Sequence, residues 1–197
     1  MEAEERIALI RQVMGASHVF CSTVSELLER TLSGATEEPL ALSQVKLLLV
    51  IAQPRQRFKV TDVAEFLGVT NAAASRSIDR LVQRGLVDRT VSQEDRRAVD
   101  LTLTEAGKAL LDRFTEARNA ELLELLGDYP EEKLRQVARL LDELSVLLLN
   151  PGPGEERCLR CGVHLRTGCV LRDVLGRECT VSQALYGAPE EVGASGA

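Results

Sequence analysis

The segment from Val60 to Leu103 constrains the fold more than any other part of the chain. Its apolar residues first recur at helical spacing up to Gly68, and a second helical pattern runs from Thr70 or Asn71 to Gly85. Two strand-like stretches follow, separated by a polar tip, which indicates a β-hairpin. Helix, tight turn, helix and hairpin in this order predict a winged helix-turn-helix, whose second helix fits a DNA major groove.

The two short helices are predicted from their ends and their apolar faces. Thr61 or Asp62 is expected to cap the first helix, and Thr70 or Asn71 the second. The expected buried positions of the second helix are Ala74, Ile78, Leu81 and Val82. The face left for solvent is polar and partly basic, and it includes Asp79.

Base recognition needs short or planar polar side chains near the start of the recognition helix. Asn71 suits adenine and Arg76 suits guanine, while the small Ala72 allows close approach. Arg80, one turn further on, is expected to reach a phosphate. The predicted DNA-binding residues are Asn71, Ala72, Ser75, Arg76 and Arg80 on the helix, with Arg96 and Arg97 near the hairpin tip.

The hairpin and the residues after it resemble the signature of the MarR-type transcriptional regulators. The segment is GLVDRTVSQEDRRAVDLTLTEAGKAL, with Asp95, Arg96, Arg97, Leu103, Thr104 and Gly107 at the signature positions. The resemblance covers roughly residues 1–149. It implies a homodimer paired through its first and last two helices, whose two winged domains read a pseudo-palindromic DNA duplex. It also implies that one wing arginine enters the minor groove.

Long amphipathic helices are predicted on both sides of this segment, over residues 4–32, 104–126 and 130–149. A shorter helix is expected from a Ser43 cap to Ala52, and Pro130 is expected at the first position of the last helix. The last helix has a broad leucine stripe, interpreted as a dimer interface rather than an internal core. Its members are Leu140, Leu141, Leu144, Leu147, Leu148 and Leu149.

The predicted fold class is mainly α: a winged helix-turn-helix with long dimerisation helices and a small cysteine-rich C-terminal extension. The breaker Asn150-Pro151-Gly152-Pro153-Gly154 marks the domain boundary. We expect winged-helix and dimerisation elements over 1–149, with the reading head at 43–103. A cysteine-rich metal-binding tail follows over 150–187, and residues 188–197 form a disordered end.

Charge is distributed in a way that suits a DNA-binding head. The chain has a net charge of −6, yet residues 54–97 contain nine Lys or Arg against six Asp or Glu and carry +3. A basic head on an acidic body attracts phosphates locally while limiting nonspecific adhesion.

The tail contains four of the five cysteines, with the spacing C-x2-C-x7-C-x9-C. Cys158, Cys161, Cys169 and Cys179 are predicted to hold a metal, because a tail this small has little other core. A [4Fe–4S] cluster is slightly favoured over zinc, since a second CxxC pair is missing. Free thiols or a redox disulfide remain the non-metal alternative. Cys21, on the first helix, is interpreted as a packing residue rather than a peroxide sensor.

The function predicted from the sequence is a dimeric, sequence-specific regulator of transcription, most simply a repressor, responsive to redox state or iron through its tail. No catalytic arrangement or phosphate loop is present, so no enzyme activity is expected. The amino terminus lacks a secretion signal, and the longest unbroken apolar runs are short, which predicts a cytoplasmic protein without a membrane partner. Two alternatives stay open: an iron–sulfur redox protein that uses the winged domain as a scaffold, and a winged-helix protein-interaction module. The sequence does not identify a small-molecule effector.

Overall fold

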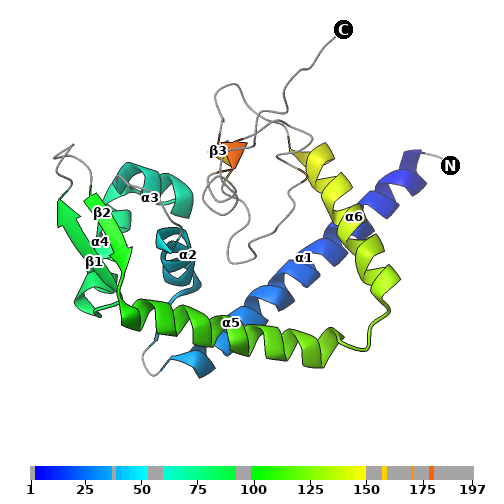
Figure 1. The fold of residues 1–197 in the computed structure, drawn as a ribbon. Helices are drawn as coiled ribbons and strands as arrows, with labels where there is room; N and C mark the ends of the chain where they lie inside the picture. The colour runs from blue at the N-terminus through cyan, green and yellow to red at the C-terminus, as the bar shows by residue number, and fades with distance from the viewer. Residues whose placement is uncertain are drawn as a thin grey trace, which may run out of the picture.

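The computed structural model describes residues 3–36, 39–52, 60–91, 99–149, 157–158, 170 and 178–179. The helices are α1 (Ala3–Ala35), α2 (Leu42–Ile51), α3 (Val60–Leu67), α4 (Asn71–Gln83), α5 (Glu105–Leu126) and α6 (Glu131–Leu148). Strands β1 (Val87–Val91) and β2 (Val99–Leu103) form the hairpin, and β3 (Arg157–Cys158) pairs with β4 (Glu178–Cys179) in the tail. The mainly helical winged-helix fold with long helices is therefore confirmed (Figure 1).

The core lies where α2, α3, α4 and the hairpin meet the first half of α5 and the last turns of α1 (Figure 1). Its most buried large side chains include Leu47, Leu48, Ile78, Leu81 and Phe114. The expected inward face of α4 is confirmed for Ala74, Ile78 and Leu81. The recognition-type helix is thus fixed from behind by aliphatic packing, the dominant favourable term in folding.

Helix ends follow local chemistry at four predicted places. Gly68 and Gly85 have φ angles of 64° and 65°, in the left-handed region that costs a glycine little. Thr70 caps α4, and its hydroxyl accepts a hydrogen bond from Ala73 N at 3.3 Å. Thr104 caps α5 in the same way, accepting from Gly107 N at 3.0 Å. These caps satisfy backbone donors that a helix start leaves open.

Three other helix starts differ from prediction. The helix α3 begins at Val60, so Thr61 lies inside it and does not cap it, and the same holds for Asp62. Ser43 also lies inside its helix, because α2 begins at Leu42. There the side chain of Gln44 accepts a hydrogen bond from Ala41 N at 3.0 Å, which replaces a hydroxyl cap.

The last helix starts one residue later than expected. Pro130 is the residue before α6, with φ −56° and ψ 126°, and the first helical residue is Glu131. The fixed φ of proline is compatible with either position, so its presence alone does not locate the helix start.

The two terminal long helices leave apolar surface uncovered. None of the residues of α6 is buried, and Leu140, Leu147 and Leu148 are exposed. In α1 only residues near its C-terminal end are buried, while Ile10 and Phe20 are exposed. Figure 1 shows α6 beside the N-terminal half of α1, and an apolar hollow of about 200 Å³ between them is lined by residues of both.

In the described part of the chain, α1 is the one helix long and apolar enough to cross a membrane, judged by length and composition alone. Its most apolar window has a mean hydropathy of 1.2. The short unbroken apolar runs in the sequence did not indicate this, because polar residues interrupt the helix at intervals.

A polar contact joins α1 to α5 beside the core. Glu121 accepts hydrogen bonds from the Arg30 guanidinium, at 2.5 and 3.2 Å, and from the buried Thr31 hydroxyl. The Thr31 hydroxyl and then the Arg30 guanidinium hold the pKa of the Glu121 carboxyl below its ordinary value. This contact fixes the crossing of the two helices that carry the reading head.

Candidate nucleic-acid interface

The exposed face of α4 is positioned by contacts on three sides. The Thr70 cap fixes its start, buried Ala74 and Ile78 fix its inner face, and Gly85 turns the chain into the hairpin. The outer face is left to solvent, with its N-terminal end available to a ligand. This is the geometry that base reading in a major groove requires.

The predicted DNA-binding residues of α4 lie on or beside this face. Asn71, Ala72, Arg76 and Arg80 are exposed, and Ser75 is half-buried. Arg76 and Arg80 are four residues apart and therefore lie one above the other on the same side of the helix. The two wing residues, Arg96 and Arg97, lie outside the described residues.

The wing is an antiparallel pair whose register runs from Val87 opposite Leu103 to Val91 opposite Val99. An ion pair connects it to the recognition helix: Arg89 Nη1 on β1 donates to Asp79 Oδ1 on α4 at 2.9 Å. Asp79 is therefore tied to the wing rather than left to solvent. Helical periodicity shows that Asp79 faces outward, but it does not show which strand residue comes to meet it.

The wing and α4 join the stem at a close backbone contact. Thr104 N donates to Leu86 O at 3.2 Å, and the Thr104 hydroxyl donates to Gly85 O at 2.6 Å. One turn into α5, a Cβ built on Gly107 would lie 2.2 Å from Leu86 O. Only a glycine lets α5 approach the α4–β1 turn this closely.

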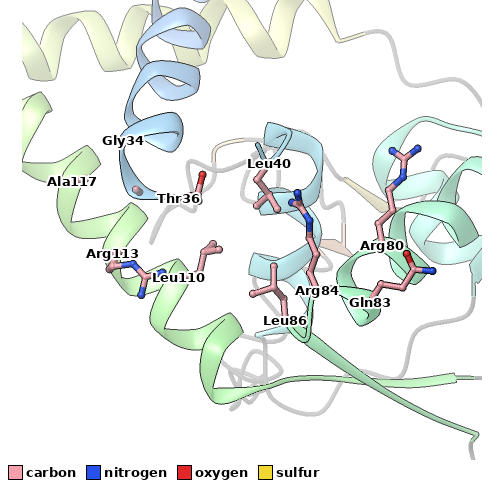
Figure 2. A pocket seen from close by; sticks show the side chains of 11 residues that line it. Gly34, Thr36, Leu40, Arg80, Gln83, Arg84, Leu86, Leu110, Arg113 and Ala117 are labelled. Carbon is pink, nitrogen blue, oxygen red and sulfur yellow. The ribbon is translucent and has the colours of Figure 1, made fainter. Parts of the chain in front are cut away.

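A cavity of about 1150 Å³ lies between the reading head and the stem. Figure 2 shows Arg113 of α5 on one wall and Arg80 and Arg84 on the other, with Leu86 and Leu110 between them. The lining residues are Gly34, Ala35, Thr36, Leu40, Arg80, Gln83, Arg84, Leu86, Leu110, Arg113 and Ala117. The lining combines cationic and aliphatic groups, which suits an anion with an apolar body.

The tail residues are described only in part. Cys158 and Cys179 lie in register in the parallel pair β3–β4, whereas Cys161 and Cys169 lie outside the described residues. The described ranges contain no cluster of three or more His, Cys, Asp or Glu side chains that could hold a metal. Cys21 on α1 is exposed, so its side chain is not held in the core of this chain.

A capped recognition helix, a two-stranded wing tied to it and a stem of long helices define a winged helix-turn-helix protein. Residues 40–98 match the family model described as the MarR family. The chain belongs to the MarR family of winged helix-turn-helix transcriptional regulators, as the resemblance predicted.

Curated relatives agree with this assignment. The chain is 32% identical to the HTH-type transcriptional repressor MdtR of Bacillus subtilis over 100 residues, which are 50% of this chain and 64% of the repressor. It is 26% identical to the HTH-type transcriptional repressor YetL of the same organism over 106 residues, 53% of this chain and 64% of that protein. The matched segments thus span somewhat less than two thirds of these relatives. Both are transcriptional regulators, in line with the expectation that the chain is no enzyme.

Solved structures share the fold. Streptococcus pneumoniae FabT, determined in complex with DNA, superimposes with a TM-score of 0.61 at 21% identity, over 71% of this chain and 96% of FabT. The YusO protein from Bacillus subtilis gives 0.54 at 24% identity, over 74% of this chain and 99% of YusO.

Proposed function

We propose that this protein is a dimeric, sequence-specific DNA-binding regulator that acts as a repressor. The observation that carries the proposal is the exposed face of α4, on which Asn71, Arg76 and Arg80 stand beside a wing that Arg89 ties to the same helix. The names of two relatives support the repressor role, and the DNA complex of a structural neighbour supports the mode of binding.

In the proposed complex α4 lies in the major groove with its N-terminal end toward the bases. Asn71 pairs with an adenine edge and Arg76 with a guanine edge, because each presents two polar groups in one plane. Arg80 lies one turn back, where a side chain meets the phosphate backbone. Arg96 and Arg97 follow the wing toward the minor groove, as the family resemblance implies.

The proposed dimer pairs α1, α5 and α6 with the same helices of a second chain. The exposed apolar residues of α1 and α6 supply the contact surface, which one chain leaves in water. Burying one leucine side chain gains about 1.5–3 kcal/mol, so a few such residues suffice to hold two chains together. A two-fold dimer places two α4 helices on a pseudo-palindromic site.

Fluorescence anisotropy on labelled duplexes tests the DNA-binding proposal. We expect the protein to bind its own promoter region more tightly than a shuffled duplex of equal length and composition. The affinity should fall steeply with salt, because bound arginines release counterions from phosphates. Equal affinity for both duplexes at every salt concentration would refute a sequence-specific regulator and favour the scaffold or protein-interaction alternatives.

We place the site of a small-molecule effector in the cavity between head and stem. A ligand there contacts α4 and α5 together and so biases the angle between them. The anionic dye 8-anilinonaphthalene-1-sulfonate is a suitable probe, because it combines a sulfonate with an apolar body. We expect saturable fluorescence enhancement that Arg113→Ala weakens and that Arg139→Ala, on the exposed surface of α6, leaves unchanged. An unchanged dye affinity in Arg113→Ala would place the dye elsewhere.

We further propose that a thiolate-bound metal centre in the tail, iron–sulfur or zinc, alters the fraction of protein bound to DNA. The tail follows α6 directly in the sequence, so its state can bias the spacing of the two reading heads. Replacing Cys158 and Cys161 by Ser should abolish metal binding and change the operator affinity. If the metal-free variant binds the operator as the parent does, under oxidising and reducing conditions alike, the regulatory role fails.

A further inference from the structure

The pairing of the two tail strands brings two distant cysteines together. Cys158 is the first and Cys179 the last of the four tail cysteines, and they lie opposite each other in the parallel β3–β4 pair. A helix drawn continuously between Cys169 and Cys179 would have kept the last cysteine away from the others. The register therefore supplies the return of the chain that a four-cysteine site needs.

The spacing of a parallel pair discriminates between possible uses of these thiols. Neighbouring strands lie about 4.8 Å apart. A disulfide needs Cβ atoms about 3.5–4.5 Å apart, which is closer than in-register residues of a regular parallel pair stand. Two thiolates on one tetrahedral zinc, each about 2.3 Å from the metal, place their sulfur atoms about 3.8 Å apart. One carbon–sulfur bond on each side bridges that small difference.

The same spacing bears on the choice of metal. In a [4Fe–4S] cluster each cysteine binds a different iron, so the sulfur atoms of two ligands are further apart than on a single ion. Cysteines in register on adjacent strands fit a single ion better. The residues between them also suit an anionic site, because residues 157–177 contain five arginines and a single carboxylate, Asp173. Nearby guanidinium groups favour the thiolate over the thiol.

We infer that the tail is a mononuclear site for a thiophilic divalent cation, zinc, founded on the Cys158–Cys179 register pair. The inference rests on the metal centre proposed above and assigns its kind. The sequence supplies Cys161 and Cys169 as the other two thiolates. The bound ion joins the two ends of the tail, so that its strand pairing and its metal occupancy rise and fall together.

Metal analysis of the full-length protein tests the inference, with Cys21→Ser as the parent so that the exposed thiol on α1 does not contribute. We expect one zinc per chain and no acid-labile sulfide after anaerobic preparation. Titration of the metal-free protein with Co²⁺ should give the intense absorbance of a tetrahedral thiolate complex. Cys158→Ser and Cys179→Ser should each weaken Co²⁺ binding at least tenfold, and Cys179→His should restore part of it.

Three outcomes would overturn the inference. Iron and sulfide in a brown protein would show a cluster, and a Cys158–Cys179 disulfide in anaerobic protein would show a redox pair. Wild-type Co²⁺ affinity in Cys179→Ser would remove the register pair from the site. Circular dichroism checks that each variant keeps its helices. Operator binding is measured separately, so a failure of DNA recognition leaves the metal result intact.

Discussion

Gly107 shows how much a single residue decides at the joint between reading head and stem. It lies in the first turn of α5, against the backbone of Leu86, which connects α4 to the wing. Thr104 bonds the same turn through its backbone and its hydroxyl. The Leu-Thr-x-x-Gly pattern at this point is therefore explained by a cap and a close approach, two physical requirements that meet within four residues.

Gly107→Ala is expected to destabilise the protein, because its Cβ would stand 2.2 Å from Leu86 O and the backbone must shift. Such overpacking costs about 1–3 kcal/mol of unfolding free energy. Gly34→Ala is the control, since nothing lies within 4 Å of its added Cβ, and it should be neutral or gain up to about 1 kcal/mol. Urea unfolding of both variants measures the difference. A Gly107→Ala protein as stable as its parent would contradict the close approach.

Arg76→Ala is expected to weaken operator binding by about 1–3 kcal/mol and to relax the preference for one base pair. The reason is the loss of a two-point contact to guanine, which no phosphate contact replaces. Arg139→Ala, on the exposed surface of α6, is the matched control and should bind as the parent does. Anisotropy on duplexes that differ at one position provides the measurement. Equal losses on all duplexes would make Arg76 a phosphate contact.

At the scale of elements, the structure shows which features a sequence can specify. The ends of α4 and the start of α5 were predictable, because Thr70, Gly85 and Thr104 act on residues within one turn. The start of α2 was not, because Gln44 does the work expected of a hydroxyl cap. The Asp79–Arg89 pair was not predictable either, since it depends on how the wing lies against α4.

The Asp79–Arg89 pair is expected to position the wing rather than to stabilise the fold. Exposed ion pairs contribute about 0.2–1 kcal/mol to stability, so Asp79→Ala should unfold almost as the parent does. Its operator affinity should nevertheless fall, because the wing loses its fixed angle to α4. Exchanging the two residues, Asp79→Arg with Arg89→Asp, should restore part of that affinity.

The comparable pair on α6 provides the control. Arg139→Ala breaks the exposed Arg139–Glu132 pair and should leave operator binding unchanged. Hydroxyl-radical footprinting locates the wing on the duplex. An exchange variant that binds no better than Asp79→Ala would indicate that Arg89 itself touches DNA.

At the scale of the whole molecule, the uncovered surfaces of α1 and α6 are the main feature. Replacing Leu140 and Leu147 by Glu places two charges seven residues apart on one face of α6, where each leucine is exposed in the single chain. We expect a folded monomer with greatly weakened operator binding, because charges cannot be buried without partners. Gln136→Glu, at an exposed position of the same helix, should remain dimeric. Light scattering that still reports a dimer for the double variant would contradict the proposed interface.

The contact between α1 and α5 makes stability depend on pH in a defined direction. Because the Thr31 and Arg30 contacts lower the pKa of Glu121, the ionised carboxylate is favoured in the folded state. Its contribution is complete at neutral pH and is lost as the pH falls below the ordinary range of a glutamate carboxyl and through the lowered pKa. Glu121→Gln should therefore be less stable than the parent at pH 7, with a difference that shrinks on acidification. Glu124→Gln, at an exposed position of α5, is the control for denaturant unfolding.

The way α1 is anchored has a consequence for how such a regulator responds to its own abundance. Only the last turns of α1 enter the core of their own chain, and the remainder faces outward. In the proposed dimer that remainder is completed by a second copy, so the unit able to span two half-sites forms with the square of the free chain concentration. Occupancy of the operator then rises more steeply than the supply of protein. Repression would begin at a threshold of expression, without any cooperativity between operators.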